Sequence, residues 1–417
     1  MSNNTKREAM ATNNNDKTLN VPHLRFPEFS GEWYSYPLTD FMSFKNGMNP
    51  DAKRFGRGIK FISVMDILNN QFICYDNIRA SVEVIEGDIE TYGVNYGDIL
   101  FQRSSETLED VGQANVYLDR KPAVFGGFVI RGKSKGNYHP VFFRYLLASP
   151  TARKRIIVKG AGAQHFNIGQ DGLSRVCLNI PSIQEQEKIA KLFECVDTRI
   201  ATQNKIIEDL KKLKSAISKH LFARKDLLET TICLSNIATL KNGYAFQSGK
   251  YNALGKWKIL TITNVSGERY INDEYCNCII NLPNDIQDHQ VLKEGDILIS
   301  LTGNVGRVSL CKNGDYLLNQ RVGLLQLAKN VNQEFLYQIL SSQRFENSMI
   351  ACGQGAAQMN IGKGDVENYV LPYSSNGNNI LWVAKILHSY DECIINELRR
   401  LTLLTMQKQY LLTQMFI

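Results

Sequence analysis

Short runs of alternating and β-branched residues mark the first part of each half of this 417-residue chain. The runs that predict strands include "IKFISV" (59–64), "DILFQ" (98–102), "KILTIT" (258–263) and "DILIS" (296–300). Apolar residues at helical spacing follow in "HPVFFRYLLASPTARKRIIV" (139–158) and "NQEFLYQILSSQRFENSMI" (332–350). The dipeptides Asn46-Gly47 and Asn242-Gly243 are typical of tight turns. We therefore expect an α+β domain in each half.

The second part of each half is a stretch of some forty residues with few helix breakers, which begins after Pro181 and again after Pro372. Its apolar residues step alternately by four and by three, the seam pattern of a coiled coil. Such a helix is about 60 Å long. We expect the two helices to pair antiparallel, with a domain near each end and a pseudo-twofold relation between the halves. The predicted seam comprises Val196, Ile200, Ile207, Leu210, Ile217 and Leu221 in one helix, and Tyr390, Ile394, Leu401, Leu404, Leu411 and Met415 in the other.

Polar residues interrupt this seam at the same two levels in both helices. Gln203 and Lys214 recur as Glu397 and Lys408. A polar seam residue costs stability and can fix register, so antiparallel helices could bring Lys214 to Glu397 and Lys408 to Gln203. The alternative is that these side chains sit at the seam's edge and extend into solvent.

The two halves are copies of one another. "GAGAQHFNIG" (160–169) recurs as "GQGAAQMNIG" (353–362), and "YGDIL" (96–100) recurs as "EGDIL" (294–298). "IAKLFECVDTRI" (189–200) likewise matches "VAKILHSYDECI" (383–394). The offsets stay between 193 and 198 residues, a drift that loop insertions produce. The repeat, after a tail that we expect to be disordered (1–22), divides the chain into a first α+β domain (23–180), a first long helix (181–226), a second α+β domain (227–372) and a C-terminal long helix (373–417).

The composition excludes some classes of protein but does not indicate a function. Residues of the hydrophobic class make up 43% of the chain and charged residues 21%, as in a globular protein. No apolar run approaches the roughly 20 residues that span a bilayer, and the polar, Asn-rich start lacks the apolar core of a secretory signal. Nine scattered cysteines fit reduced thiols, and we expect a cytoplasmic protein with no membrane partner.

Net charge permits a nucleic-acid partner without requiring one. The chain carries +7, yet residues 31–180 hold 18 basic and 15 acidic side chains, and residues 227–372 hold 12 and 13. Catalytic signatures are missing: there is no complete phosphate-binding loop, no GxSxG and no HExxH motif. "NPD" (49–51) falls short of the Asn-Pro-Pro-aromatic motif of adenine methyltransferases. Cys276 and Cys278 lie close together, but incidental packing explains them better than a zinc site, which needs about four ligands.

The remaining candidates for a binding site are polar loops that are repeated in both domains. Side chains of Ser, Thr, Asn, Gln and Arg at strand ends can hydrogen-bond phosphates and base edges; ordinary turns and solvated loops are the alternative. In the first domain the candidates are Lys45, Asn46, Arg103, Ser104, Ser105, Gln113, Gln164, His165 and Asn167, with Arg54, Arg57 and Lys60 assigned to phosphates. In the second they are Lys241, Asn242, Tyr244, Gln247, Thr302, Asn304, Arg307, Asn319, Gln320, Arg321, Gln358 and Asn360.

With these residues in view, the chain resembles the specificity subunit of type I restriction-modification systems. The resemblance rests on "VPHLRFPEFSGEW" (21–33), the duplicated "LKNG"-like entry, "GDIL" with its polar loop, the doubled "NIG" phrase and "IPSIQEQEKIAKLFECVDTRI" (180–200). It covers nearly the whole chain. One departure is that the second helix opens with "NNILWVA" (378–384) where the first has "EQEKIA" (185–190).

The resemblance implies a non-catalytic subunit in which each domain reads half of a split site in double-stranded DNA while the helices set the spacing. It further implies two adenine-methylating modification subunits and restriction subunits that translocate and cut. S-adenosylmethionine, ATP and magnesium would be bound by those partners, and no cofactor by this chain. Composition leaves a rival open, a coiled-coil adaptor with paired ligand-binding domains and no DNA; a self-contained methyltransferase lacks a cofactor motif.

Overall fold

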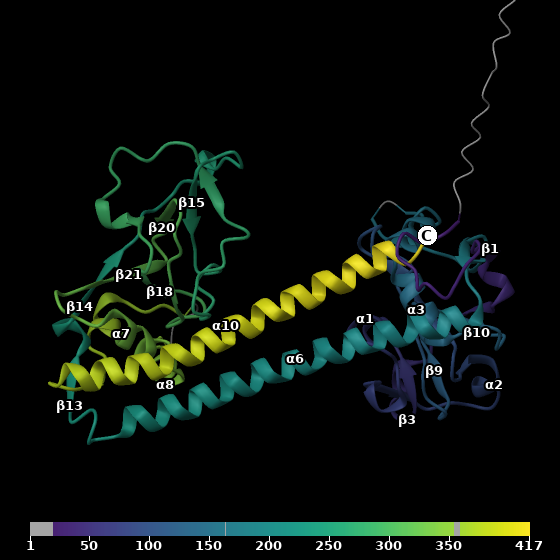
Figure 1. Cartoon of the computed structure of the whole chain (residues 1–417), viewed down its shortest axis with the longest axis horizontal. Coiled ribbons are helices and arrows are strands. Elements are labelled where there is room, and N and C mark those ends of the chain that lie inside the picture. The colour runs from purple at the N-terminus through teal and green to yellow at the C-terminus, as the bar shows by residue number, and fades with distance from the viewer. Residues whose placement is uncertain (1–19, 163, 354–358) are drawn as a thin grey trace, which may run out of the picture. The chain divides into compact units, whose positions relative to one another are not determined.

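The computed structural model describes residues 20–162, 164–353 and 359–417, so most of the predicted tail and Gln358 lie outside the described part. The chain forms two compact units (Figure 1). The first contains the described residues up to Ala201 together with Thr402–Ile417, and the second contains Thr202–Leu401. Two long helices, α6 (Ile183–Ala223) and α10 (Gly377–Gln414), each contribute to both units.

The first unit is built on two four-stranded sheets. One has the order β2 (Met42–Asn46), β10 (Val129–Ser134), β6 (Ile99–Gln102), β8 (Ala114–Val116), with antiparallel neighbours. The other has the order β4 (Ala80–Val82), β3 (Phe55–Ile62), β9 (Ala123–Phe125), β5 (Gly93–Val94). Two-stranded pairs join β1 (Tyr34–Pro37) to β12 (Cys177–Ile180) and β7 (Ser104–Ser105) to β11 (Phe166–Asn167). The helices are α1 (Val64–Asn69), α2 (Asp88–Tyr92), α3 (Pro140–Ala148), α4 (Pro150–Ile157) and α5 (Gln170–Ser174).

The second unit repeats this plan. Its sheets have the orders β14 (Ala238–Asn242), β21 (Val322–Leu327), β18 (Ile297–Ser300), β19 (Val308–Leu310) and β16 (Asn277–Ile279), β15 (Trp257–Leu260), β20 (Tyr316–Leu318), β17 (Val291–Leu292). A strand pair joins β13 (Thr230–Cys233) to β22 (Val370–Tyr373). The helices are α7 (Gln333–Leu340), α8 (Gln343–Cys352) and α9 (Lys363–Glu367). The predicted duplication and the α+β class are therefore confirmed.

A serine divides the helical run of each domain at the same place. Ser149 accepts a hydrogen bond from the backbone of Ala152 and so caps α4, and Ser342 does the same for α8 through Phe345. Capping satisfies backbone donors that the start of a helix leaves free. The apolar faces of α3 and α7 are buried and belong to the main hydrophobic core of their unit. Each core therefore holds the sheet, the helix pair of the domain and a stretch of both long helices together.

The two long helices run antiparallel within each unit. In the first unit, Phe193 and Val196 of α6 share a core with Leu411 and Met415 of α10. In the second unit, Leu221 near the end of α6 shares a core with residues near the start of α10. All predicted seam residues are buried or half-buried, as expected of a packed helix pair. The antiparallel coiled coil is thus confirmed.

The polar seam residues pair differently from the prediction. Gln203 Nε2 donates to Glu397 Oε2 at 2.6 Å, so equivalent residues of the two helices face one another. Lys214 lies eleven residues beyond Gln203, roughly 16 Å along the axis at 1.5 Å per residue, and Glu397 is out of its reach. Lys214 instead binds Asp391 at 2.5 Å, and Lys408 binds Asp197 at 2.6 Å. The predicted contacts Lys214–Glu397 and Lys408–Gln203 are therefore wrong.

Candidate nucleic-acid interface

In the first domain, the predicted polar segments lie at neighbouring strand ends on one side of the sheet β2-β10-β6-β8. β2 ends at Asn46, which is paired with Ile130, and β6 ends at Gln102, which is paired with Val129. The backbone N–H of Gly47 donates to the carbonyl of Val129 at 3.2 Å. The backbone N–H of Arg103 donates to Phe128 at 2.9 Å. The turn at 45–48, the loop at 103–113 and the turn at 126–128 are consequently neighbours.

The repeated Gly- and amide-rich phrase joins the same group of loops. Strand β11 within it pairs with β7, which places Phe166 opposite Ser105 and Asn167 opposite Ser104. The Ser104 hydroxyl donates to the amide oxygen of Asn167. We call four loops the loop edge of the first domain: residues 45–48, 103–113, 126–128 and the described part of the phrase, 161–162 with 164–168. Gln164 and His165 are exposed there.

The second domain has an equivalent loop edge, formed by residues 241–244, 301–307, 319–321 and 359–361. The backbone N–H of Gln320 donates to Tyr244 at 3.0 Å, and that of Gly303 donates to Met359 at 2.9 Å. Thr302 bridges to Asn360 as Ser104 pairs with Asn167 in the first domain. Exposed side chains on this edge are Asn242, Asn304, Gln320, Arg321 and Asn360.

Three of the candidate polar side chains serve the fold of their own domain. Asn319 is buried, and its Oδ1 accepts the backbone N–H of Arg321 at 3.1 Å. Gln113 donates to Asp110 at 2.7 Å. The Tyr244 hydroxyl donates to Asp285 at 2.8 Å, and this hydrogen bond raises the pKa of Tyr244. In the "NQR" triplet only Gln320 and Arg321 therefore point outward. Gln247 is exposed at the start of a short 3-10 turn beyond this edge.

The three cations assigned to phosphates lie on or beside β3 and are engaged within their domain. Arg54 forms an ion pair with Asp88 and donates to the carbonyl of Glu83. Arg57 is paired with the Glu83 carboxylate at 2.6 Å, and Lys60 donates to the carbonyl of Ile78 at 2.8 Å. β3 reaches the loop edge at its other end, where Ile62 accepts from Gly126. Acids of the same domain thus offset the charge of Arg54 and Arg57.

The first turns of α4 and α8 hold the long loop of each edge, although neither helix contributes a predicted site residue. Arg153 Nη2 donates to the carbonyls of Glu109 at 2.8 Å and Val111 at 2.6 Å. Burial lowers the pKa of Arg153, partly offset by Asp110. The equivalent residue in α8, Glu346, lies 3.5 Å from the Arg307 guanidinium of its loop. The same helical position thus anchors the loop by opposite charges in the two domains.

A glycine in left-handed conformation completes each loop anchor. Gly112 (φ +70°) faces Ile156, and Gly306 (φ +78°) faces Met349, the equivalent residue of α8. A Cβ at Gly306 would lie 2.6 Å from that of Met349, so only glycine fits both the space and the backbone conformation. The recurrence of Val-Gly at 111–112 and 305–306 was the signal that could have located this contact.

A buried carboxylate on each long helix attaches the adjacent domain. Asp391 accepts from Arg269 at 2.9 Å and Gln338 at 2.6 Å in addition to Lys214. Its equivalent, Asp197, accepts from the Tyr145 hydroxyl at 2.8 Å and Gln71 at 3.1 Å in addition to Lys408. Because charged groups are buried only when paired, these contacts fix how each domain sits on the helix pair of its own unit.

Two features are absent from the described part of the chain. No group of three or more His, Cys, Asp or Glu side chains is placed to hold a metal ion among residues 20–162, 164–353 and 359–417. Within the same residues, no helix is both long enough and apolar enough to cross a membrane.

Comparison with known proteins identifies the domains. Residues 30–212 and 229–405 each match the family described as the type I restriction modification DNA specificity domain. The chain is 23% identical over 378 residues to the putative type I restriction enzyme MjaX specificity subunit of Methanocaldococcus jannaschii, covering 85% of this chain and 86% of that protein. It is 24% identical over 361 residues to the MjaVIII specificity subunit of the same organism, covering 78% of each.

A solved structure shares the fold. The type I restriction-modification S subunit from M. genitalium superimposes with a TM-score of 0.54 at 16% identity, covering 95% of this chain and 99% of that one. The two family matches together include more than half of the residues. The chain belongs to the family of type I restriction-modification specificity subunits, in which it serves DNA sequence specificity.

Proposed function

We propose that this chain reads a two-part, asymmetric DNA site, with one half-site under each loop edge. The observation that carries the proposal is that the same four-loop arrangement is built twice from different side chains. Where the first domain has Gly127 and Phe128, the second has Gln320 and Arg321. A shared backbone frame with different exposed groups is what two different half-sites require.

Chemistry at the two loop edges supports readout of bases. Arginine pairs bidentately with guanine and Asn or Gln with adenine in the major groove, where all four base pairs are distinguishable. Gln320, Arg321 and Asn304 are exposed on the second edge. The first edge presents Gln164, His165 and Asn167 as exposed polar groups. Arg103 is half-buried and donates to the carbonyl of Gly127, so it also orders the turn beside it.

The chain positions DNA for other subunits in this proposal and carries out no chemistry itself. Methylation of adenine requires the base to be flipped into a catalytic pocket, which two modification subunits would provide together with S-adenosylmethionine. Restriction subunits would bind ATP and magnesium, translocate and cut. All of these act in the cytoplasm. The nearly balanced charges of the two domains fit a subunit whose partners supply many of the phosphate contacts.

Sequencing of adenine methylation in cells with and without the gene tests the proposal. We expect a split motif with two different halves that disappears on deletion. Exchange of residues 227–372 for the equivalent domain of a relative should change one half of the motif and leave the other half intact. An unchanged methylome would refute the proposed reading of a two-part site that directs methylation.

A further inference from the structure

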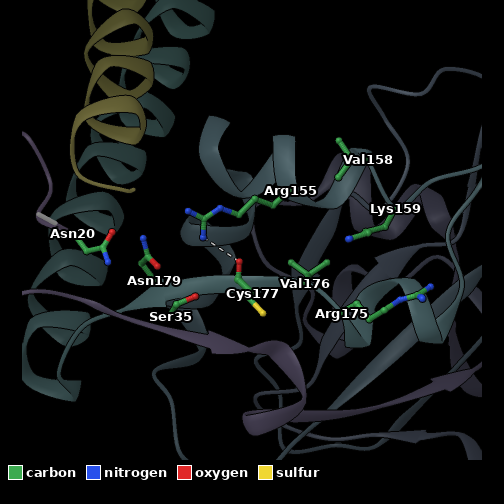
Figure 2. Close-up of a pocket in the computed structure, with 9 residues that line it drawn as sticks. All are labelled: Asn20, Ser35, Arg155, Val158, Lys159, Arg175, Val176, Cys177 and Asn179. Atoms are coloured by element: carbon green, nitrogen blue, oxygen red, sulfur yellow. Dashed lines mark hydrogen bonds between the residues drawn. The ribbon is translucent and has the colours of Figure 1, made fainter. Parts of the chain in front are cut away.

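An open hollow of about 500 Å³ lies in the first unit beside the loop edge (Figure 2). Strand β12 contributes Cys177 and Asn179 to its lining, and Ser35 of β1 adds a hydroxyl. Arg155, near the end of α4, and Lys159, just beyond that helix, line it as well. None of the described residues that line the hollow is acidic.

Three cations line the hollow, and Arg155 and Lys159 differ from the third, Arg175. Figure 2 shows the charged ends of Arg155 and Lys159 over the hollow, whereas the Arg175 guanidinium is directed away from it. Arg155 Nη1 donates to the carbonyl of Cys177 at 3.0 Å, which orients the guanidinium. Within the described ranges, neither Arg155 nor Lys159 takes part in an ion pair. Their charge is therefore available to an anion, unlike that of Arg54 and Arg57.

The hollow adjoins the loop edge through the chain itself. Lys159 directly precedes the phrase that begins at Gly160, and Gly160 packs against Val111 and Leu108 of the long loop. Lys159 also lies against Gly172 of α5, so its position is fixed on two sides. A strand of DNA bound at the loop edge would have its backbone within reach of this surface.

At the equivalent positions of the second domain the two cations are replaced by uncharged residues. The residues equivalent to Arg155 and Lys159 are Ser348 and Cys352, and those equivalent to Ser35 and Asn179 are Thr231 and Pro372. The loop edges are thus duplicated, but the basic hollow is not.

We propose that Arg155 and Lys159 bind phosphates of the DNA strand that passes the first half-site, and that the second half-site has no matching anchor. This inference rests on the proposed function. Two cations standing apart along one hollow suit the successive phosphates of a backbone better than one small anion. The guanidinium fork suits phosphate oxygens, and the hydroxyl and amide of Ser35 and Asn179 are the neutral donors that commonly accompany such contacts.

The test measures DNA affinity of the full-length chain, in complex with its modification subunits, as a function of salt. We expect Arg155→Gln and Lys159→Gln each to reduce the slope of log affinity against log salt by about 0.9, the value for one phosphate contact. At about 0.15 M salt this corresponds to a roughly fivefold loss of affinity for each contact. Arg175→Gln is the matched control, because it removes the same charge from a nearby side chain that points away.

A second experiment locates the contact on the DNA. Neutral methylphosphonates are placed singly along a duplex that carries both half-sites. We expect weaker binding for substitutions flanking the first half-site, and we expect Arg155→Gln to abolish that sensitivity. Thermal unfolding of each variant checks that the domain remains folded.

Three outcomes would overturn the inference. The variants could show the same salt slope as Arg175→Gln while wild-type complex still prefers its target, which would leave the proposed function intact. They could release the modification subunits without changing the slope, which would make the hollow a protein contact. A wild-type complex that does not distinguish its target from other DNA would remove the proposed function and this inference together.

Discussion

Arg153 offers the sharpest test of how the first loop edge is held. Its guanidinium donates to two carbonyls of the loop 103–113, and Arg153→Ala removes both hydrogen bonds. A hydrogen bond from a charged group contributes about 1.5–3 kcal/mol, so two amount to roughly 3 kcal/mol or more. If the free loop must be ordered on binding, this free energy is lost from specific affinity. The affinity for the specific target should therefore fall about a hundredfold, since about 1.4 kcal/mol corresponds to a factor of ten.

The assay compares three duplexes in competition: the full target, a target altered in the first half-site, and one altered in the second. With Arg153→Ala we expect the penalty for altering the first half-site to shrink and the penalty for the second to remain. Glu346→Ala is the counterpart in the other domain. Its partner atom lies 3.5 Å away and both side chains are partly exposed, so a loss of at most about 1 kcal/mol at the second half-site is expected.

Two results would refute this reasoning. One is an equal loss of affinity of Arg153→Ala for all DNA, unrelated sequences included, which would indicate a phosphate contact and not a loop anchor. The other is unchanged discrimination at the first half-site in a folded protein. Arg153→Lys, which keeps the charge but not the fork, should restore only part of the discrimination.

Three further predictions concern stability. Asp391→Ala leaves buried Arg269 and half-buried Lys214 without their shared acceptor and should cost about 3–5 kcal/mol, measured by hydrogen exchange of α10 amides. A cost below about 1 kcal/mol would contradict it. Gly306→Ala should cost about 1–2 kcal/mol in backbone strain and more from overlap with Met349. Gly267→Ala, with φ +89° and only ordinary van der Waals contacts to Arg307 at 3.6 Å or more, should show the strain alone in urea unfolding. The Lys258 side chain, aided by Lys312 and Tyr316, holds the pKa of Asp273 well below its usual range. The ionised Asp273 therefore stabilises the folded state fully above the unfolded pKa of about 3.9, and this stabilisation is lost as pH falls through the lower folded pKa. Asp273→Asn should make the free energy of unfolding less dependent on pH in acid, and an unchanged acid profile would count against this prediction.

The sequence was sufficient for the architecture because its signals are periodic and occur twice. Heptad spacing and the constant offset predict the antiparallel helices and the duplicated domains. Polar pairing across the seam was not predictable, because it depends on helix register. That register is set by packing of whole domains, and a shift of a few residues exchanges every partner. Asp197 and Asp391, which the seam pattern passes over, became the partners for this reason.

The loops of the candidate interface were predicted from the sequence, but the residues that anchor those loops were not. Strand-end loops can be read from turn residues, and their meeting follows from the sheet order. Arg54 and Arg57 were assigned to phosphates on charge alone, whereas the structure pairs them with acids distant in sequence, Asp88 and Glu83. Arg153 and Glu346 carry opposite charges at equivalent positions, so comparison of the two copies conceals their shared role.

The contact between Gln203 and Glu397 is the place where the duplicated chain meets itself. In an assembly of two identical half-chains, this position would face its own copy, either as two glutamates that repel or as two glutamines. Because the two halves are joined in one polypeptide, the residue at this position can differ between the two copies. Here one copy supplies a donor and the other an acceptor. The contact is therefore directional, and it favours the union of unlike halves over the pairing of like ones.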